Sequence, residues 1–461
     1  MTDPRFAHPD DIRSRFSAAM SAMYRTEVPA YGTLMQIVSD VNDGVLAANA
    51  GLKADLENTD QLARISEERH GAIRLGTPAE LSTMRRLFAV MGMAPVGYYD
   101  LTEAGVPVHS TAFRPVGEAA LRRNPFRVFT SLLRLDLIED ADLRETAQTV
   151  LDARQIYTPR CLELIDLAEQ NGGLTEAEAD EFVAEALETF RWHPEANVSA
   201  DLYKQLHDAH RLIADVVSFR GPHINHLTPR TLDIDRVQDL MPEYGIAPKA
   251  VVEGPPRREH PILLRQTSFK ALSEAVNFDG IPGSHTARFG EIEARGQALT
   301  PKGRALYDQL LTETRQKCLP AGDGSNADAY MTALQDTFAA FPDDLTAIRE
   351  QGLGYFEWSL TGKGTAGQIT ETDPEALLAA GYLRIDPIVY EDFLPVSAAG
   401  IFQSNLGDDS AQEFTASPNQ QRFETDLGAT VLNEFDHYQQ IEDQSRIRCV
   451  TILTTGAAAA E

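Results

Sequence analysis

The stretch Glu-Arg-His-Gly-Ala-Ile-Arg-Leu-Gly-Thr-Pro-Ala-Glu, residues 68–80, decides the local fold. Its first part alternates briefly, which is typical of a strand. Thr77-Pro78-Ala79-Glu80 then supplies an N-cap residue, a proline at the first helical position and the glutamate of a capping box. Apolar residues follow at helical spacing as far as Gly92, namely Leu81, Met84, Phe88 and Met91. We therefore predict a strand followed by a helix over residues 68–92.

His70 and Arg74 are four residues apart in this stretch. Positions i and i+4 share a face in a strand and in a helix, so the imidazole and the guanidinium point the same way in either case. This arrangement would suit a metal that holds one end of an anionic substrate while the arginine binds the other end. A histidine and an arginine on one face are also common on protein surfaces, so the pair alone assigns no function.

Three further segments are rich in β-branched and aromatic residues and are bounded by glycine or proline, which is typical of strands. These segments are residues 96–101, 106–113 and 126–135. With the first strand and helix they predict a βαβββ unit over residues 68–139. A second, less regular unit is expected at 212–300, with a short helix within 232–241 and strands at 212–219, 224–227, 249–254, 262–269 and 287–293.

The rest of the chain has helical periodicity. Residues 1–67 predict N-terminal helices, residues 140–211 a helical insertion, and residues 301–461 a mainly helical C-terminal region. The fold class that follows is α+β, with two strand-rich units and large helical insertions. Because 461 residues exceed what one hydrophobic core usually serves, we expect two or three subdomains or one heavily inserted domain.

The chain is strongly acidic, with 41 Lys and Arg residues against 69 Asp and Glu residues and a formal net charge of −28. Such a chain repels nucleic acids and anionic membranes at long range, so neither is an expected partner. A small anionic substrate would therefore need a local basic pocket.

The cysteine pattern and the N-terminal segment bear on the compartment. Cys161, Cys318 and Cys449 are far apart and form no CxxC motif, so we expect neither a disulfide framework nor a thiolate zinc site. The N-terminal segment has no apolar signal sequence, and no run of eighteen apolar residues occurs. We expect a soluble, cytoplasmic protein.

A second histidine cluster occurs in Gly-Pro-His-Ile-Asn-His-Leu-Thr-Pro-Arg, residues 221–230. His223 and His226 are three residues apart, so they would face opposite sides of a strand, and one of them at most would join a shared site. Alternatively, both are turn or core histidines that bond to the backbone.

Paired carboxylates occur in Phe-Gly-Glu-Ile-Glu, residues 289–293. Glu291 and Glu293 would share one face of a strand, with Ile292 opposite, and buried carboxylates need a cation nearby. The alternative is a solvated edge strand whose glutamates pair with Arg288 and Arg295. Two histidines and one carboxylate from separate strands would form the ligand set of non-haem iron(II) oxygenases, which leaves positions open for a chelating substrate and dioxygen.

Several long blocks of the chain resemble the 2-oxoadipate dioxygenase/decarboxylase family, from about residue 10 to about residue 440. The resemblance implies a fold related to the vicinal-oxygen-chelate proteins, with paired βαβββ units around an iron(II) centre and added helices. The blocks are ERHGAIRLGT, AGVPVHSTAFRP, NPFRVFTSLLRL, GPHINHLTPRTLDIDR, EGPPRREHPILLRQTSFKAL, HTARFGEIEARG and YEDFLPVSAAGIFQSNLG.

The resemblance also implies the metal ligands. Carried over residue by residue, the iron(II) ligands would be His70, His226 and Glu291. The segment FGEIEAR is also similar to the ligand strand of 4-hydroxyphenylpyruvate dioxygenase, and this favours Glu291 over Glu293 as the ligand.

Substrate contacts are implied in the same way. Arg74 would be the catalytic arginine that holds a substrate carboxylate, and the three ligand residues would contact the substrate at the metal. Within the segment 387–405, Val396 would contact the substrate, with Ser397 beside it as a polar neighbour.

The reaction that the resemblance implies converts 2-oxoadipate and dioxygen to 2-hydroxyglutarate and carbon dioxide, a step of lysine degradation. The small-molecule partners would then be a 2-oxo diacid and dioxygen, and the cofactor Fe(II). Two alternatives remain: a metal-dependent isomerase or lyase of the vicinal-oxygen-chelate superfamily, and a non-catalytic protein that binds a small anion. The oligomeric state is left open.

Overall fold

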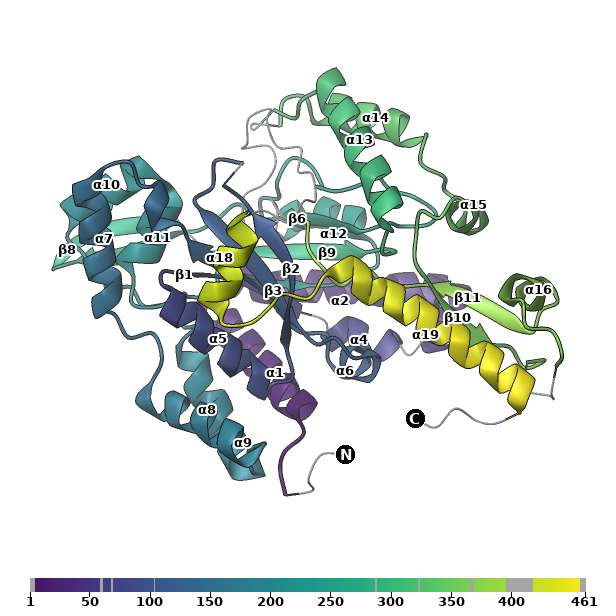
Figure 1. The fold of residues 1–461 in the computed structure, drawn as a ribbon. Coiled ribbons are helices and arrows are strands. Elements are labelled where there is room, and N and C mark those ends of the chain that lie inside the picture. Colours follow the sequence, from purple (N-terminus) through teal and green to yellow (C-terminus); the bar gives the residue numbers. More distant parts are fainter. Residues whose placement is uncertain are drawn as a thin grey trace. The chain divides into compact units, whose positions relative to one another are not determined.

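The computed structural model describes residues 5–58, 61–67, 69–102, 104–286, 288–321, 324–364, 369–394 and 418–456 (Figure 1). The chain divides into two compact units. The first comprises residues 1–253, 266–294 and 393–431, and the second comprises residues 254–265, 295–392 and 432–461. No helix among the described residues is long and apolar enough to cross a membrane.

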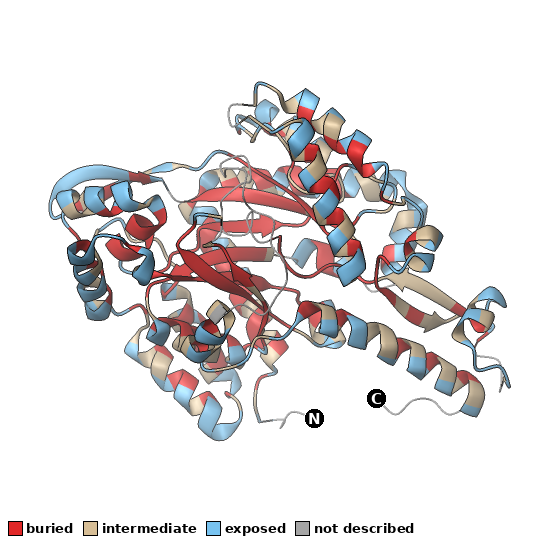
Figure 2. Cartoon of the chain, turned by 45° about the horizontal axis from the view of Figure 1, so that its top comes forward, coloured by how far each residue is buried: buried red, intermediate tan, exposed pale blue. Residues whose placement is uncertain are grey.

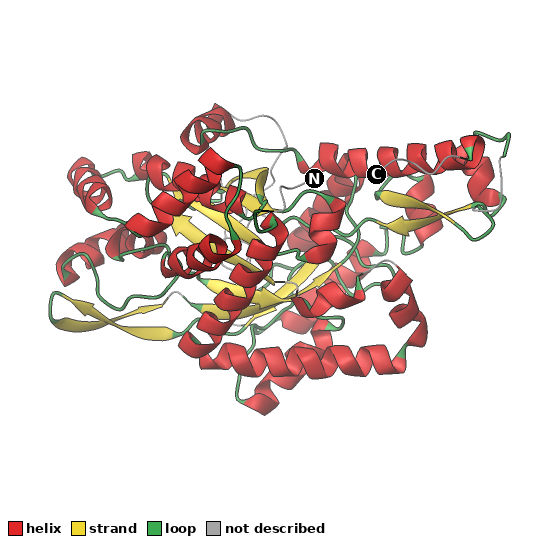
Figure 3. Cartoon of the chain, turned by 90° about the horizontal axis from the view of Figure 1, so that it is seen from below, coloured by secondary structure: helices red, strands yellow, loops and turns green. Residues whose placement is uncertain are grey.

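A seven-stranded mixed sheet forms the centre of the first unit, in the order β2-β3-β4-β1-β5-β9-β6. The sheet curls into a half-barrel (Figure 3). Most of its strand residues are buried, whereas the helices around it are exposed on one side (Figure 2). The strands are β1 (Arg69–Leu75), β2 (Ala94–Asp100), β3 (Val108–Arg114), β4 (Arg127–Leu133), β5 (His226–Pro229), β6 (Leu264–Ser268) and β9 (Phe289–Arg295).

The first βαβββ repeat consists of β1, α5 (Pro78–Val90), β2, β3 and β4, with the short helix α6 (Glu118–Arg123) inserted before β4. β1 and β4 are parallel, and β3 is antiparallel to both β2 and β4. Thr77 caps α5, and Glu80 completes the capping box by accepting from the backbone of Thr77. The strand and helix predicted from residues 68–92 are therefore confirmed.

The second repeat consists of β5, α12 (Ile234–Leu240), β6 and β9. β5 is parallel to β9, as β1 is to β4, and β5 joins β1 in an antiparallel pair. The strand predicted at 249–254 is wrong, because the chain there makes only isolated antiparallel bridges, such as Glu253 with Gln266. The predicted α+β fold with paired strand–helix–strand repeats is confirmed, and the second repeat lacks that strand.

Residues on the two faces of the sheet belong to two separate hydrophobic cores. Ile73 and Leu75 of β1 pack into the larger core, together with α1 (Pro9–Glu27) and α2 (Pro29–Ala48). Ala72 of the same strand packs into the other core. Among the described residues, the remaining helices of this unit are α3 (Ala50–Asn58), α4 (Leu62–Glu67), α7 (Ala141–Ala153), α8 (Pro159–Asn171), α9 (Glu176–Glu188), α10 (Ala200–Ala209), α11 (Arg211–Ser218) and α18 (Pro418–Leu427), with short 3-10 helices at Leu135–Leu137 and Met241–Tyr244.

The strand predicted at 212–219 is wrong, because these residues form the helix α11. Leu212, Ile213, Val216 and Val217 recur at i, i+1, i+4 and i+5, which is helical spacing, but three of these four residues are β-branched, and the prediction followed that composition. His210 caps its N-terminus through Nδ1, which accepts from the backbone of Leu212.

A β-hairpin that the sequence prediction missed lies between β6 and β9. It pairs β7 (Ser273–Phe278) with β8 (Ile281–Thr286) in a separate two-stranded sheet, visible as a long ribbon in Figure 3. Asp279 and Gly280 form its turn, with φ angles of 50° and 86°. An Asp-Gly pair between two extended segments is a strong hairpin signal and could have predicted it.

The described part of the second compact unit is mainly helical, with one antiparallel strand pair, β10 (Phe356–Leu360) and β11 (Leu383–Pro387). A small core around Trp358, Leu383 and Cys449 holds this pair against the long helix α19 (Glu434–Thr455). The other helices are α13 (Pro301–Lys317), α14 (Ala327–Phe338), α15 (Leu345–Glu350) and α16 (Pro374–Ala379).

Candidate metal site and basic cavity

Three predicted ligand residues come together on the curled sheet. His70 lies on β1, His226 on β5 and Glu291 on β9, and each is fully buried. These three residues are called the ligand group, and one ligand atom from each lies within 4.8 Å of the other two. Glu291 Oε1 is 3.1 Å from His70 Nε2 and 3.9 Å from His226 Nε2. Ligands that bind one ion at about 2.1 Å in perpendicular directions lie ~3 Å apart, so this spacing is close to that of a metal site.

Strand pairing explains why these residues meet. β1 is antiparallel to β5, and β5 is parallel to β9, so three neighbouring strands carry the three side chains. Gly71 lets the chain approach closely here, because a Cβ atom at this position would lie 2.8 Å from the backbone oxygen of His226. Alternation places Glu291 on the inner face of the sheet, while Ile292 packs into the core on the other side.

Two of the three residues, His226 and Glu291, have buried polar atoms that a metal ion could use. Among the described residues, neither ring nitrogen of His226 has a hydrogen-bond partner, and neither has Glu291 Oε2. Burial lowers the pKa of His226 to about 4, so its imidazole is neutral and can donate a lone pair. Buried polar atoms without partners are costly, and a divalent cation would satisfy them together.

Neighbouring side chains fix the orientation of Glu291. Its Oε1 accepts a hydrogen bond from Gln266 Nε2 at 2.8 Å and one from Thr228 Oγ1 at 3.2 Å. Both donors come from strands of the second repeat, so the carboxylate is held by the same sheet that carries it.

Glu293 lies behind His70. Its Oε2 is 3.2 Å from His70 Nδ1, and its Oε1 accepts from Arg127 Nη2 at 2.9 Å. Burial lowers the pKa of His70, but the charges of Glu293 and Glu291 outweigh burial, so this pKa is raised. A carboxylate that holds the second nitrogen of a ligand histidine is a common support of metal sites.

The alternative of a solvated edge strand is wrong, since Glu291 and Glu293 are both fully buried. Arg288 instead binds Glu274, and Arg295 donates to the backbone oxygen of Tyr390.

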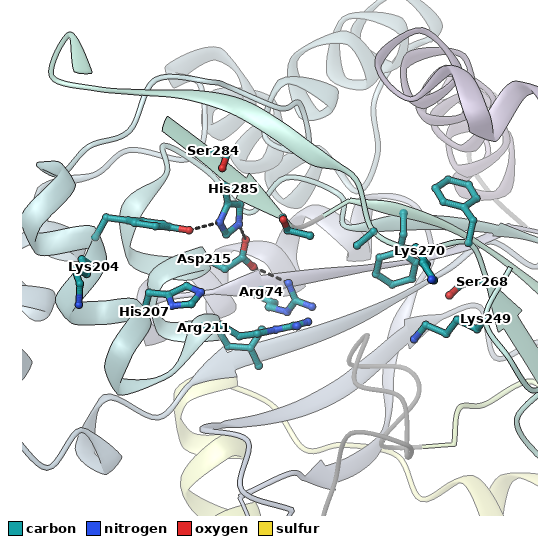
Figure 4. Close-up of a pocket in the computed structure, with 16 residues that line it drawn as sticks. Arg74, Lys204, His207, Arg211, Asp215, Lys249, Ser268, Lys270, Ser284 and His285 are labelled. Atoms are coloured by element: carbon teal, nitrogen blue, oxygen red, sulfur yellow. Dashed lines mark hydrogen bonds and ion pairs between the residues drawn. The ribbon is translucent and has the colours of Figure 1, made fainter. Parts of the chain in front are cut away.

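Arg74 lies beside a basic cavity of about 540 Å³, shown in Figure 4. Its Nη1 donates to Asp215 Oδ2 at 2.6 Å and to Asn225 Oδ1 at 2.8 Å. Among the described residues, Asp215 is the only carboxylate that lines the cavity. The other charged residues in its wall are the cations Lys204, Arg211, Lys249 and Lys270. A chain with a net charge of −28 thus has a local basic pocket of the kind that a small anion requires.

The remaining residues singled out in the sequence lie apart from the ligand group. His223 is buried against Trp192, with ring centroids 4.7 Å apart, and its Nε2 is 3.5 Å from Asp215 Oδ1. Val396 and Ser397 lie outside the described residues.

Sequence reasoning did not identify Asp215 or Asn225. Asp215 interrupts the apolar run Leu-Ile-Ala-Asp-Val-Val, and a lone carboxylate inside such a run indicates a buried partner. Asn225 directly precedes the ligand candidate His226 and had no signal of its own.

Comparison with known proteins identifies the family. The sequence model of the 2-oxoadipate dioxygenase/decarboxylase family matches residues 16–405. A 2-oxoadipate dioxygenase/decarboxylase of Pseudomonas putida is 59% identical over 458 residues, which are 98% of this chain and 99% of the relative. That of Escherichia coli is 58% identical over 95% of this chain and 98% of its own length.

A solved structure is similar over almost the whole chain. The crystal structure of the hydroxyglutarate synthase in complex with 2-oxoadipate from Pseudomonas putida is 58% identical, with a TM-score of 0.91. The match covers 98% of this chain and 100% of that one. On the sequence match, the close relatives and the shared fold, the chain belongs to the 2-oxoadipate dioxygenase/decarboxylase family.

Proposed function

We propose that this protein is a non-haem iron(II) dioxygenase that converts 2-oxoadipate and dioxygen to 2-hydroxyglutarate and carbon dioxide. The observation that carries the proposal is the buried group of His70, His226 and Glu291 on the sheet that also carries Arg74 and its basic cavity. A relative whose crystal structure contains 2-oxoadipate supports the choice of substrate.

His70, His226 and Glu291 would hold the metal ion. Two imidazoles and one carboxylate are the donor set of non-haem iron(II) oxygenases, and this set leaves positions for a chelating 2-oxo acid and dioxygen. The chemistry that ferrous iron supplies when bound is the activation of dioxygen and of the 2-oxo acid. Glu293 would keep His70 Nδ1 occupied, so that Nε2 is presented to the metal.

The cavity would bind the rest of the substrate. 2-Oxoadipate is a dianion at neutral pH, and the cavity wall is rich in cations. Arg74 would receive the carboxylate remote from the keto group, because a guanidinium can bind both carboxylate oxygens. We also propose substrate contacts by Val396 and Ser397. Holding both ends of the molecule would align the reacting carbon.

Aromatic rings would limit the access of water to the reaction. The ring of Phe393 meets His70 edge-on at 4.9 Å, and the ring of Phe289 lies 4.9 Å from that of His226. Both phenylalanines are buried. A dry surrounding strengthens the electrostatic interactions of the site and protects reactive species from side reactions.

The atoms of the proposed reaction balance. The bond between C1 and C2 of 2-oxoadipate breaks, and C1 leaves as carbon dioxide. One oxygen atom of dioxygen enters the new carboxylate at C2, and the other becomes the hydroxyl on the adjacent carbon. Lysine degradation as the pathway and the cytoplasm as the compartment stay predictions.

The experiment that tests this proposal is oxygen uptake by the iron(II)-loaded protein with oxaloacetate, 2-oxoglutarate, 2-oxoadipate or 2-oxopimelate, with the product masses recorded. We expect uptake with 2-oxoadipate and a product of the mass of 2-hydroxyglutarate. The zinc-loaded protein should consume no oxygen. Product formation without oxygen or with zinc would instead indicate an isomerase or lyase.

Matched histidine variants test the ligand group. His226→Gln should lose iron and turnover, whereas His223→Gln, three residues away and outside the group, should retain iron. Retention of iron by His226→Gln would refute the ligand assignment.

A further inference from the structure

We propose that Asp215, itself held by His285, is a positioning residue that fixes the guanidinium of Arg74 in the cavity. This inference rests on the proposed function, because it assumes that Arg74 receives a substrate carboxylate. It assigns a role to Asp215 of helix α11 and to His285 of strand β8. Neither residue belongs to the ligand group or to the side chains that hold that group in place.

A chain of hydrogen bonds leads to Arg74 through Asp215 (Figure 4). Asp215 Oδ2 accepts from Arg74 Nη1 at 2.6 Å, and Asp215 Oδ1 lies 2.9 Å from His285 Nε2. His285 Nδ1 is in turn 2.8 Å from the hydroxyl of Tyr203. A neutral imidazole satisfies both contacts, since its Nε2–H donates to the carboxylate while Nδ1 accepts from the tyrosine.

The carboxylate of Asp215 lies in α11 with 6% of its side chain exposed. Burial raises the pKa of Asp215, but Arg74 and the histidines His223 and His285 outweigh burial and hold it well below its usual range. The group is therefore charged, and a buried charge requires the partners that surround it. A hydrophobic residue would fill this place in the apolar helix at lower cost, so the carboxylate is better explained by what it binds.

Asn225 holds the same guanidinium nitrogen from a second direction. Its Oδ1 accepts from Arg74 Nη1 at 2.8 Å, and its own backbone N–H donates to the oxygen of Ala72 at 2.9 Å. Asn225 directly precedes His226. Arg74 is thus oriented by a residue whose neighbour belongs to the metal-binding group.

The hairpin supplies the other end of this arrangement. On β8, His285 is the only buried residue, and the other five positions from Ile281 to Thr286 are exposed. Its ring lies 4.7 Å from that of Phe219 and points to the cavity that Arg74 lines. The first repeat has no corresponding hairpin between β3 and β4. This insertion therefore brings an imidazole to the carboxylate that binds Arg74.

A positioning role predicts a characteristic change in kinetics. Asp215→Asn keeps the shape of the side chain but removes its charge, so the cation that attracts the substrate remains. Substrate binding should survive, while the guanidinium loses its fixed direction and the reacting carbon its alignment. We expect kcat to fall ~10–100-fold and KM to change by less than ~3-fold.

Variants of His285 separate positioning from general stability. His285→Leu removes the donor to Asp215 and should lower kcat about tenfold, whereas His285→Gln keeps an N–H donor and should restore most of that loss. His109 is a matched control, because it is also a fully buried histidine but lies on β3 outside the cavity wall. His109→Leu should leave kcat and KM unchanged.

The test combines steady-state kinetics, iron content and anaerobic calorimetric binding of 2-oxoadipate and 2-oxopimelate to the iron-loaded protein. In Asp215→Asn, a mobile Arg74 should reduce the preference for 2-oxoadipate over the longer diacid ~5-fold or more. An unchanged kcat in Asp215→Asn, or an increase in KM alone, would overturn the proposal. Equal losses of kcat in His285→Gln and His285→Leu would also overturn it. If Asp215→Asn does not fold, the comparison of these two His285 variants tests the proposal instead.

Failure of the proposed function would look different. A wild-type protein that binds iron and 2-oxoadipate but consumes no oxygen would refute the dioxygenase reaction. The change in preference between the two diacids would still show whether Asp215 positions Arg74, because binding is measured without oxygen.

Discussion

Replacing Glu293 by glutamine would remove the negative charge behind His70 and keep the size of the side chain. Glu293 is fully buried and lies 3.2 Å from Nδ1 of His70 and 2.9 Å from Nη2 of Arg127. The variant therefore perturbs both a proposed metal ligand and a buried ion pair, and the two effects can be measured separately.

The two effects differ in size. Loss of a carboxylate that supports a ligand histidine typically weakens metal binding about 10–100-fold, which corresponds to about 1.4–2.7 kcal/mol. Leaving a buried arginine without its anion costs on the order of 3–5 kcal/mol of folding stability. A glutamine oxygen can still accept from Arg127, so we expect the lower end of that range. The loss of folding stability should therefore be larger than the loss of iron-binding free energy.

The assay pairs anaerobic competition for iron(II) against a chelator with urea unfolding of the metal-free protein. Glu274→Gln is the matched control, because Glu274 also accepts hydrogen bonds from an arginine, Arg288, but lies on the hairpin strand β7 away from the ligand group. It should lose stability and keep its iron affinity. If Glu293→Gln behaves in the same way, Glu293 is merely the partner of Arg127, and the reasoning is refuted.

Three further outcomes are expected. Arg74→Lys should lower kcat/KM for 2-oxoadipate ~10–100-fold, because an ammonium cannot bind a carboxylate in the bidentate mode. Turnover of 2-oxohexanoate, which lacks the second carboxylate, should change little. Equal losses with both substrates would contradict this role. Glu291→Gln should lose stoichiometric iron in elemental analysis, because its charge neutralises the cation; full iron content would exclude Glu291 as a ligand. Burial lowers the pKa of Lys249 to about 8, so its charge is present below that pH and lost above it. KM for the dianionic substrate should rise as the pH increases through that value, and Lys249→Arg should abolish the rise.

Short-range sequence patterns were sufficient to predict those elements whose backbone is determined by neighbouring residues. The capping box at Thr77 and Glu80, the helix after it and the strand before it follow from short-range hydrogen bonds and alternation, and the structure has all three. The inner face of β9 was also predictable, because Glu291 and Glu293 alternate with the apolar Ile292.

Long-range pairing was beyond these signals. No spacing in the chain shows that Asp215 in α11 binds Arg74 in β1, or that His285 reaches Asp215 from a hairpin. The helix α11 was mistaken for a strand because the prediction followed its β-branched composition and not the helical spacing of its apolar residues. The ligand group needed the family resemblance, since its three residues are separated by more than 60 residues along the chain at each step.

The antiparallel junction of β1 and β5 has a practical consequence. His70 and Arg74 precede the helices α7–α11, whereas His226 and Glu291 follow them, so cutting the polypeptide within those helices would yield two fragments that each lack part of the ligand group. If iron affinity returns when such fragments are mixed, β1 of one fragment has paired again with β5 of the other. The centre would then serve as a sensor of whether the two halves of the sheet have joined.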